Sequence, residues 1–316
     1  MARHAPTRLP LVRALLVVNP TATATTVRAR DVLGQALSSQ TRLEVVETKA
    51  RGHATELASA AVDEFDIVVA MGGDGTVNEV VNGLLAQGPR PGLPALAVVP
   101  GGGTNVFARA LGLPNSAKDA TSMLMEALRR GRRRTVGLGR ADDRWFTFNA
   151  GLGFDAGVVR LVDRSRAAGR RATPGRYVCG GFRQFFVHTE RRERALLLER
   201  PGSEPEPLGL ALVCNTAPWT YLGARAVDPC PRASFDTGLD LFGLRRLRTL
   251  PTLWHLQQIL ARRPHPRGRD VLAVHDASEL VLSSGRPQPF QLDGEDLGDR
   301  TRVVLTSVPA ALCVVA

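Results

Sequence analysis

Two glycine-rich turns contain the residues whose types and spacing are best suited to chemistry. The first, AMGGDGTVNEVVNGLL (70–85), and the second, AVVPGGGTNVFARALGLP (97–114), each follow an apolar run and precede a helix-like pattern. Glycine lacks a Cβ, so a phosphate can approach the backbone amides, and the N-terminus of a following helix favours anions. Two such turns at neighbouring strand ends favour one phosphate-lined site over two unrelated tight turns, which are the structural alternative.

Asp74 lies inside the first turn and would by itself repel a phosphate. It therefore indicates a magnesium ion held through water, or a hydroxyl that must be oriented. The following helix, expected to begin at Thr76, carries a core-facing stripe at helical spacing. Its members are Val77, Val80, Val81, Leu84 and Leu85. Asn78, Glu79 and Asn82 are left on the other faces, to contact a ligand or to brace the turn.

Two further stretches of sequence extend this candidate site. Thr104 and Asn105 follow the second turn and are expected to cap the next helix, which is also their purely structural alternative. The first apolar run ends in Asn19 and Pro20, followed by TATATT, whose hydroxyls can hydrogen-bond a nucleotide. The strand ends thus point to one edge of a sheet, where α/β proteins bind ligands.

The elements that must position these residues alternate along the first half of the chain. Short apolar runs at 14–18, 43–48, 66–71 and 95–99 are typical of parallel strands buried on both faces. Crossover helices are expected between them, within 25–39, 54–65 and 76–87. This pattern predicts a doubly wound α/β nucleotide-binding domain over residues 1–136.

The second half, residues 137–316, is predicted to be an antiparallel β-sandwich domain whose last strand can return to the first domain. Its strand-like runs fall at 135–141, 144–154, 194–200, 208–216, 238–244, 270–276, 279–284, 288–294 and 301–308. Two helical insertions are expected, around 173–188 and 250–263, and the basic segment 160–176 is a candidate mobile loop or phosphate-facing arm.

The order of these motifs resembles the diacylglycerol kinase catalytic-domain family, which includes bacterial lipid kinases and sphingosine kinases. The matching stretches are VVNP, GGDGTVNEVVNGL, TNVFARALGLP, FNAGLGFDA and QLDGE, spread over essentially the whole chain. GGDGT alone is shared with NAD kinases, whereas the longer pattern is narrower. The resemblance implies an ATP-binding domain, a β-sandwich domain, and a cleft between them where a lipid hydroxyl accepts the γ-phosphate.

The resemblance also implies roles for individual residues. ATP would be surrounded by Asn19, Pro20, Thr21, Thr23, Thr48, Gly72, Gly73, Asp74, Gly75, Thr76, Asn78 or Glu79, Gly102, Gly103, Thr104 and Asn105. The family's proposed general base corresponds to Asp293 of the DGE motif, with Glu295 beside it, and Mg²⁺ would neutralise the phosphates. An isolated DGE would more simply be a β-turn.

Three departures from the family pattern stand out. No glycine follows NP, a hydroxyl residue of the second turn is replaced by glycine, and the paired aspartates of a structural magnesium site become ASFDTGLD. Ser234, Asp236 and Thr237 are therefore weak metal candidates, because a hard cation prefers charged oxygens.

The leading hypothesis is an ATP-dependent lipid kinase that converts diacylglycerol to phosphatidic acid. Kinases of a sphingoid or prenol-like alcohol, a soluble-substrate kinase such as an NAD kinase, and a catalytically inactive nucleotide-binding regulator are the alternatives. The chain has a formal charge of +11, nearly all of it arginine, which favours phosphate-bearing partners or simply reflects a solvated surface. RRGRRR (129–134) lacks interleaved aromatic residues, so a nucleic-acid partner is not expected.

The four cysteines lack metal spacing, and no apolar run approaches the roughly 18 to 20 residues that cross a bilayer. We therefore expect a reduced, cytoplasmic protein that visits the inner membrane face peripherally, with its oligomeric state open, a homodimer included. The segment LPTLWHLQQILARRPHPRGR (250–269) is the best candidate for membrane contact, with an apolar face beside an arginine-rich end. The alternative is a helix packed on the β domain with a solvated basic end.

Overall fold

The computed structural model describes residues 12–154, 156–160 and 195–316. The described chain divides into two compact units. Unit 1 comprises Met1–Gly103, Leu113–Arg134 and Cys313–Ala316, and unit 2 comprises Thr104–Gly112 and Thr135–Leu312. The predicted division into a nucleotide domain and a substrate domain at residue 136 stays a prediction. The predicted insertion at 173–188 and the basic segment 160–176, except Arg160, lie outside the described residues.

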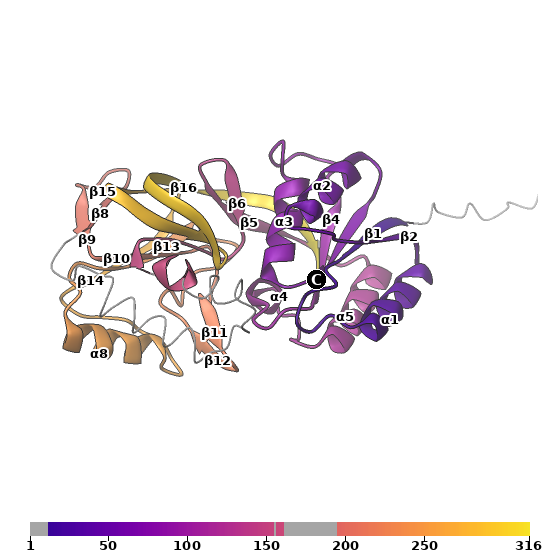
Figure 1. Ribbon diagram of the computed structural model, residues 1–316, viewed down its shortest axis with the longest axis horizontal. Helices are drawn as coiled ribbons and strands as arrows, with labels where there is room; N and C mark the ends of the chain where they lie inside the picture. Colours follow the sequence, from indigo (N-terminus) through magenta and orange to yellow (C-terminus); the bar gives the residue numbers. More distant parts are fainter. Residues whose placement is uncertain (1–11, 155, 161–194) are drawn as a thin grey trace, which may run out of the picture. The chain divides into compact units, whose positions relative to one another are not determined.

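Unit 1 is the predicted doubly wound α/β structure. Its strands are β1 (Val12–Val18), β2 (Thr41–Glu47), β3 (Ile67–Gly72) and β4 (Ala95–Pro100), and its helices are α1 (Val27–Ser38), α2 (His53–Ala60), α3 (Asp74–Leu84) and α5 (Ala117–Arg130). The strands pair in parallel in the order β4-β3-β1-β2, and the end of β16 joins beside β4 through Val314 and Leu96. Helices α1 and α5 cover one face of this sheet and α2 and α3 the other (Figure 1).

Alternation along the strands explains this layering. Leu16, Val69 and Val99 pack with Leu33 of α1 and Leu124 of α5 in one core. Their neighbours in sequence point to the opposite face and are also buried, so the strands read as continuous apolar runs. The expectation of full burial is wrong for β2, whose residues are mostly half-buried or exposed. β2 is an edge strand, so it has a neighbour on one side only.

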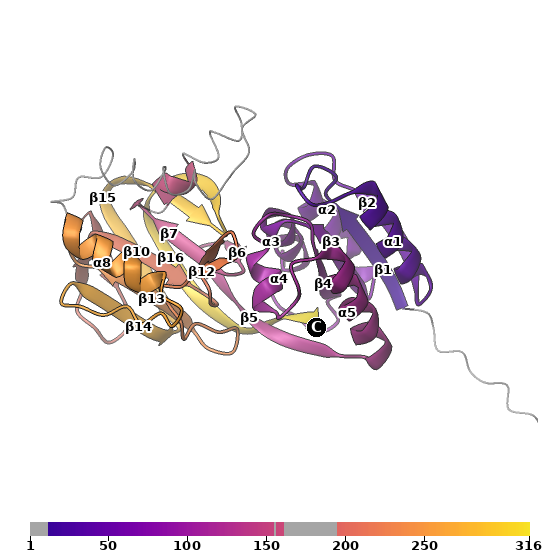
Figure 2. The same ribbon diagram turned by 90° about the horizontal axis from the view of Figure 1, so that it is seen from below.

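Unit 2 is built from antiparallel strands, as expected (Figure 2). Its strands are β5 (Arg133–Ala141), β6 (Arg144–Phe146), β7 (Asn149–Leu152), β8 (Leu196–Glu199), β9 (Glu206–Leu208), β10 (Leu210–Cys214), β11 (Thr220–Leu222), β12 (Arg225–Val227), β13 (Leu239–Leu244), β14 (Val271–Ala277), β15 (Glu279–Leu292) and β16 (Glu295–Val315). The helices in this part include α4 (Val106–Ala110) and α8 (Thr249–Ile259), and residues 156–160 are helical as well.

Two predicted strands of unit 2, 279–284 and 288–294, are one long strand, β15. Gly285 and Pro287 between them suggested a break, but the ladder with β16 instead shifts register between Ser283 and Gln288 and continues. A bulge of this kind accommodates residues that cannot donate to the ladder. The order β14-β13-β10-β7-β15-β16 places the Asp293–Gly294 turn, which joins β15 to β16, beside β7.

Candidate active site

The two glycine-rich turns meet in unit 1 because glycines allow their backbones to touch. The Gly101 amide donates to the Gly72 carbonyl at 2.8 Å. A Cβ on Gly72 would lie 2.6 Å from the Thr76 hydroxyl oxygen, and one on Gly101 would lie 3.0 Å from the Gly72 Cα and would collide with the Thr25 hydroxyl. A Cβ on Gly73 would lie 3.3 Å from the Gly102 Cα. These glycines are therefore required by close packing of one turn on the other.

Gly75 and Gly103 have no such packing reason. A Cβ built on either residue meets no atom within 4 Å, and neither has a positive φ. α3 begins at Asp74, two residues before the expected Thr76, with Gly73 at the N-cap position. Gly75 therefore occupies the first turn of this helix. Gly73 has no side chain with which to cap this helix start. The first-turn amides have no partner within the helix itself, as at any helix N-terminus, and can donate to a ligand.

The end of β1 joins the same place through a side-chain contact. The Asn19 amide nitrogen donates to the Thr76 hydroxyl at 2.9 Å, and the Asn19 side-chain oxygen accepts from the Thr21 amide and hydroxyl at 3.0 and 2.8 Å. Thr23 is exposed on the following turn, and Thr48 follows β2, with its amide on the Val18 carbonyl. Three strand ends thus contribute to one edge of the sheet.

Thr25 was not singled out from the sequence. Its hydroxyl oxygen is buried beside Gly101 and has no hydrogen-bond partner. The Ala24 amide donates to the Gly101 carbonyl at 2.7 Å, which holds the threonine-rich turn against the second glycine turn. The only signal in the sequence was membership of the TATATT run.

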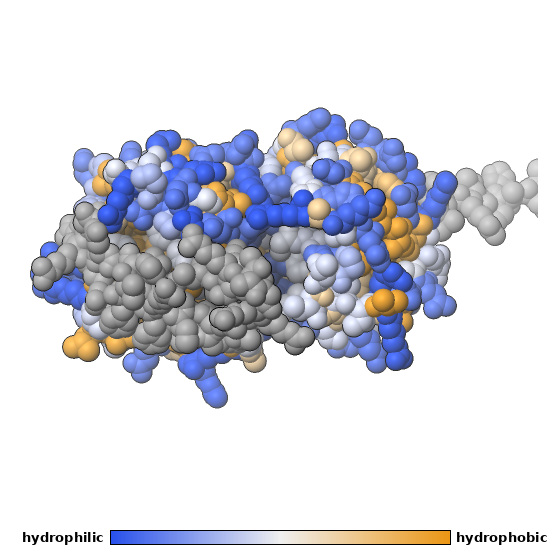
Figure 3. Space-filling model, in the orientation of Figure 1, coloured by the Kyte–Doolittle hydropathy of each residue, from blue (hydrophilic) through white to orange (hydrophobic). Residues whose placement is uncertain are grey.

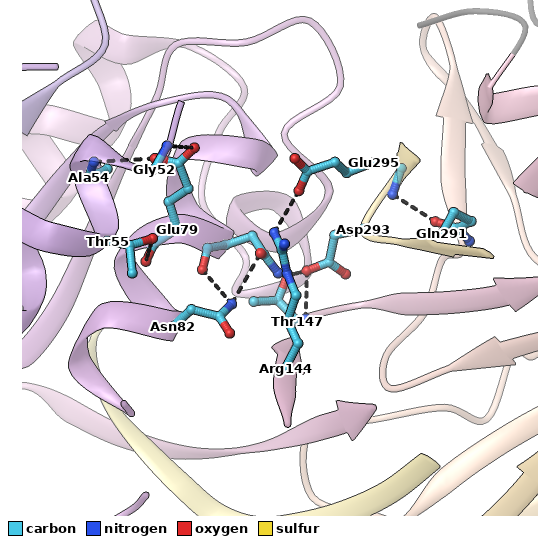
Figure 4. A network of polar contacts seen from close by, with 12 residues as sticks. Gly52, Ala54, Thr55, Glu79, Asn82, Arg144, Thr147, Gln291, Asp293 and Glu295 are labelled. Carbon is cyan, nitrogen blue, oxygen red and sulfur yellow. Dashed lines mark hydrogen bonds and ion pairs between the residues drawn. The ribbon is translucent and has the colours of Figure 1, made fainter. Parts of the chain in front are cut away.

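Glu79 braces the structure around the turn (Figure 4). Its carboxylate accepts from the amides of Gly52 and Ala54 at 2.9 and 3.2 Å, at the start of α2, which has no cap of its own. A carboxylate at a helix N-terminus is favoured by the helix dipole. Of the two alternatives for this residue, contact with a ligand or bracing, these bonds favour bracing.

Asn78, next to it, is buried, and its backbone carbonyl and side-chain oxygen both accept from the Asn82 amide group, at 2.9 and 3.1 Å. This pair lies along one side of α3. The Asn78 and Asn82 side chains are therefore turned toward each other.

The expected capping of α4 by side chains is wrong. Asn105 holds the N-cap position with φ 49°, in the left-handed region, and its side chain makes no cap hydrogen bond. A residue in this conformation does not aim its side chain at the helix amides in the way an extended N-cap residue does. Thr104 and Asn105 belong to unit 2, where α4 is anchored by Phe107 packing edge-on against Phe235 and by Arg109 over the ring of Tyr221.

The DGE motif forms the two-residue hairpin turn between β15 and β16. Asp293 and Gly294 both have positive φ, 49° and 77°, and Leu292 pairs with Glu295. This is the geometry for which Asp-Gly is preferred in hairpins. The β-turn expected from an isolated DGE is therefore present, and Asp293 makes further contacts within it.

The Asp293 carboxylate is almost completely buried and holds the chain that enters β7. One oxygen accepts from the Thr147 amide and hydroxyl at 2.7 and 2.8 Å, and the other accepts from the amides of Phe148 and Asn149 at 2.9 and 3.1 Å (Figure 4). Burial raises the pKa of the Asp293 carboxyl above its usual value, against the opposing effect of these hydrogen bonds. Four accepted bonds occupy about the full acceptor capacity of a carboxylate.

A buried polar network that sequence reasoning missed surrounds this turn. The Asn149 side chain donates to the Trp219 carbonyl at 2.9 Å and accepts from Gln291 at 3.1 Å. Gln291 in turn accepts from the Gly294 amide at 2.9 Å, and Asn215 donates to the Thr147 carbonyl at 3.0 Å. Asparagine and glutamine inside apolar strand patterns were the available signal, because a buried amide needs partners.

Glu295 is placed differently from Asp293. Its carboxylate forms an ion pair with Arg144 at 2.7 Å, and about a fifth of its side chain is exposed, against about a third for Arg144. Both carboxylates of the DGE motif therefore lie at one turn, one committed to backbone amides and the other paired with an arginine in a partly open position.

The weak metal candidates do not fit a magnesium site. The Ser234 hydroxyl accepts from the Asp236 amide at 3.2 Å, and the Thr237 hydroxyl donates to the Ser234 carbonyl at 3.1 Å, so both hydroxyls serve a local turn. Asp236 supplies the one charged oxygen ligand of the three and is exposed. No group of three His, Cys, Asp or Glu side chains suitable for a metal occurs within residues 12–154, 156–160 and 195–316.

Comparison with known proteins identifies the family of this chain. Residues 13–141 match the model of the diacylglycerol kinase catalytic domain. A diacylglycerol kinase of Staphylococcus aureus (strain NCTC 8325 / PS 47) is 34% identical over 253 residues, covering 78% of this chain and 74% of the relative. A diacylglycerol kinase of Bacillus subtilis (strain 168) is 42% identical over 107 residues, so this match spans only 33% of the relative's length.

Solved structures show the same fold. A diacylglycerol kinase from Bacillus anthracis str. Sterne superposes with a TM-score of 0.70 at 19% identity, covering 96% of both chains. An NAD kinase from Archaeoglobus fulgidus in complex with ATP superposes less well, with a TM-score of 0.52 at 11% identity and 96% and 93% coverage. From its sequence relatives and the matching catalytic-domain model, the chain belongs to the diacylglycerol kinase catalytic-domain family.

Proposed function

We propose that this protein is an ATP-dependent lipid kinase that transfers the γ-phosphate of ATP to the hydroxyl of a lipid alcohol, with diacylglycerol as substrate and phosphatidic acid as product. The observation that carries the proposal is the uncapped start of α3, packed against the second glycine turn and flanked by two glycines with open space beside them. Amide donors and a helix N-terminus around open glycines suit the phosphates of a nucleotide. The names of the relatives suggest the substrate.

In this proposal unit 1 binds the nucleotide. The first-turn amides of α3 donate to its phosphates, and Asn19 and Thr76 shape the edge of the site through their shared hydrogen bond. Asp74, in the same first turn, would hold the metal ion that accompanies the nucleotide. Magnesium would neutralise phosphate charge when bound; the stretch 234–237 does not supply a separate site for it.

We assign the role of general base, which accepts the proton of the lipid hydroxyl, to Glu295 rather than to Asp293. A general base needs an oxygen that can turn toward the substrate, and the Asp293 oxygens already accept four hydrogen bonds from 147–149. Glu295 is partly exposed, and its carboxylate is paired with Arg144 at the same turn. Asp293 then acts as a positioning residue that fixes the turn on which Glu295 stands.

A lipid panel tests the function. Purified protein, Mg²⁺ and radiolabelled ATP are mixed with short-chain diacylglycerol, a sphingoid base, a prenol and NAD, and each product is separated by chromatography. Labelled phosphatidic acid above all other products is the expected result. Labelled NADP would instead support the soluble-substrate alternative. ATP binding without transfer to any acceptor would support the inactive regulator and sink the proposal.

A substrate that resides in a membrane requires the protein to reach the bilayer surface. Every helix in the described part of the chain is too short or too polar to span a bilayer. We therefore propose that the protein associates with the membrane peripherally, at the cytoplasmic face where ATP is present.

A further inference from the structure

Helix α8 carries an apolar face that points away from the core of unit 2. Leu250, Leu253 and Trp254 are 78, 41 and 49% exposed and recur at the spacing of one helix side, with Leu256 beside them at 43%. The opposite side of the helix is buried through His255 and Ile259, and Ile259 belongs to the core beneath. Figure 3 shows hydrophobic residues at the surface where α8 lies in Figure 1.

α8 exposes more apolar side chains than is usual for the surface of a soluble protein. Soluble proteins leave single apolar residues exposed, but here four large ones lie on one helix of 11 residues, with the exposed Gln257 among them. The polar alternative, a helix that turns charged residues to water, does not apply, because α8 contains no Asp, Glu, Lys or Arg.

Exposed arginines lie on both ends of the helix. Arg246 and Arg248 precede it, and Arg262, Arg263, Arg267 and Arg269 follow, while residues 246–269 include no acidic side chain. The Gln258 side chain accepts from the Arg267 amide at 2.7 Å and donates to the Arg267 carbonyl at 3.3 Å, which ties the following arginine segment to the helix. Cations are thus held at both ends of the apolar strip.

We infer that α8 and its flanking arginines are a docking surface for an anionic lipid bilayer. An apolar strip between cationic groups matches the layering of a bilayer surface, with acyl chains below a layer of negative headgroups. The exposed leucines and Trp254 enter the boundary of the acyl region, and the arginines bind lipid phosphates. This inference rests on the proposed lipid kinase function for its choice of occupant.

The test is sedimentation of the full chain with vesicles. Wild-type protein is expected to bind vesicles of mixed phosphatidylglycerol and phosphatidylcholine, to lose binding in high salt, and to bind pure phosphatidylcholine weakly. Leu250→Glu with Leu253→Glu should reduce the binding constant at least about tenfold, because it removes apolar side chains that enter the bilayer. Arg262→Glu with Arg263→Glu should do the same, since each basic residue near an anionic surface contributes about fivefold.

Matched controls are available in unit 1. Val27 and Val32 of α1 are 66 and 51% exposed, and Arg132 and Arg133 are an adjacent exposed pair. Val27→Glu with Val32→Glu, and Arg132→Glu with Arg133→Glu, should bind vesicles like wild type. If either control lowers binding as much as the α8 changes, binding is a property of overall charge or apolarity and the inference is wrong.

Two further measurements check that the α8 variants are folded and have the same mass as wild type. Urea unfolding must show that the α8 variants remain folded, as expected for exposed sites. Sedimentation velocity without vesicles must show that they have the same mass as wild type. A wild-type dimer that the leucine substitutions dissociate would mean that the strip is a self-association surface and would overturn the inference.

Phosphorylation of short-chain diacylglycerol in solution separates this inference from the proposed function. Variants that phosphorylate short-chain diacylglycerol but no longer bind vesicles support both the docking surface and the proposed function. An active wild type that binds no anionic vesicles overturns the docking surface alone. Vesicle binding by a wild type that phosphorylates no lipid overturns the proposed function and leaves the docking surface standing.

Discussion

The carboxylate of Asp293 accepts hydrogen bonds from both the backbone amide and the hydroxyl of Thr147, at 2.7 and 2.8 Å, although the two residues are 146 positions apart in the sequence. Together with the bonds from Phe148 and Asn149, these contacts attach the β15–β16 turn to the entry of β7. The aspartate of the DGE motif is therefore built into the folded unit, and its loss should be seen first in stability.

Replacing Asp293 with asparagine should lower the free energy of unfolding by about 2–5 kcal/mol. The amide nitrogen of asparagine is a donor, so it would face two of the groups that now donate to the carboxylate, and each buried group left without an acceptor costs about 1–3 kcal/mol. Urea unfolding measures the loss. Calorimetric titration should find ATP affinity unchanged in the folded fraction. Unchanged stability with collapsed turnover would instead return the role of general base to Asp293.

Replacing Glu295 with glutamine should lower kcat about 10²- to 10⁴-fold, the range of general-base catalysis, while stability and the KM for ATP stay near wild type. The control is Glu206→Gln, because Glu206 also pairs with arginines, Arg245 at 2.7 Å and Arg200 at 3.1 Å, and is similarly exposed, at 23% against 21%. Glu206→Gln removes at least as much ion pairing and should leave turnover unchanged. Equal effects of both variants would mean that Glu295 acts only through its ion pair.

The sequence was sufficient where neighbouring residues determine the structure. Continuous apolar runs predicted β1, β3 and β4, and the stripe of valines and leucines predicted α3, because burial follows directly from local pattern. It was insufficient where partners come from elsewhere. Nothing near Glu79 shows that its carboxylate binds the start of α2, and nothing near Asp293 shows its four donors in 147–149.

The edge position of β2 and the merging of two predicted strands into β15 have the same origin. Both depend on which strand lies alongside, and pairing is decided by the whole sheet. A run of apolar residues does not show whether the strand pairs with a second strand on its other side. Local pattern thus predicted the elements, and only the three-dimensional structure showed which groups the carboxylates and amides of the candidate site contact.

Replacing Gly75 with alanine should change stability and ATP affinity in opposite directions. Alanine is favoured over glycine in a helix by about 0.5–1 kcal/mol, and a Cβ at this position meets no atom of the protein within 4 Å. If a nucleotide phosphate approaches the amides here, the added methyl group should weaken ATP binding about tenfold or more. Thermal unfolding and calorimetric titration measure the two effects.

The matched control is Gly34→Ala in α1, where a Cβ likewise has open space. Its stability should rise by a similar amount, and its ATP affinity should not change. ATP affinity that is also unchanged in Gly75→Ala would show that the phosphates bind elsewhere.

Replacing Asp228 with asparagine should remove part of the pH dependence of stability. Burial, with a smaller contribution from nearby Asp240, raises the pKa of the Asp228 carboxyl to about 6, and one of its oxygens is buried without a hydrogen-bond partner. A carboxyl whose pKa is higher in the folded than in the unfolded state, near 3.8, contributes stability that is fully present below about pH 3.8. That contribution is lost as the pH rises through about 6.

The full shift corresponds to about 3 kcal/mol, which partial exposure reduces to about 1–2 kcal/mol, and roughly half of this change falls between pH 5 and 7.5. On going from pH 5 to pH 7.5, the free energy of unfolding of Asp228→Asn should therefore fall by about 0.5–1 kcal/mol less than that of wild type. Urea unfolding at both pH values measures it, with Asp143→Asn as an exposed control. The Asp228 carboxylate accepts a hydrogen bond from the Cys230 amide, which lowers its pKa by less than burial raises it. Asp228→Asn should therefore exceed wild type in stability at pH 7.5, and a less stable variant there would mean that this hydrogen bond outweighs the cost of burying the charge.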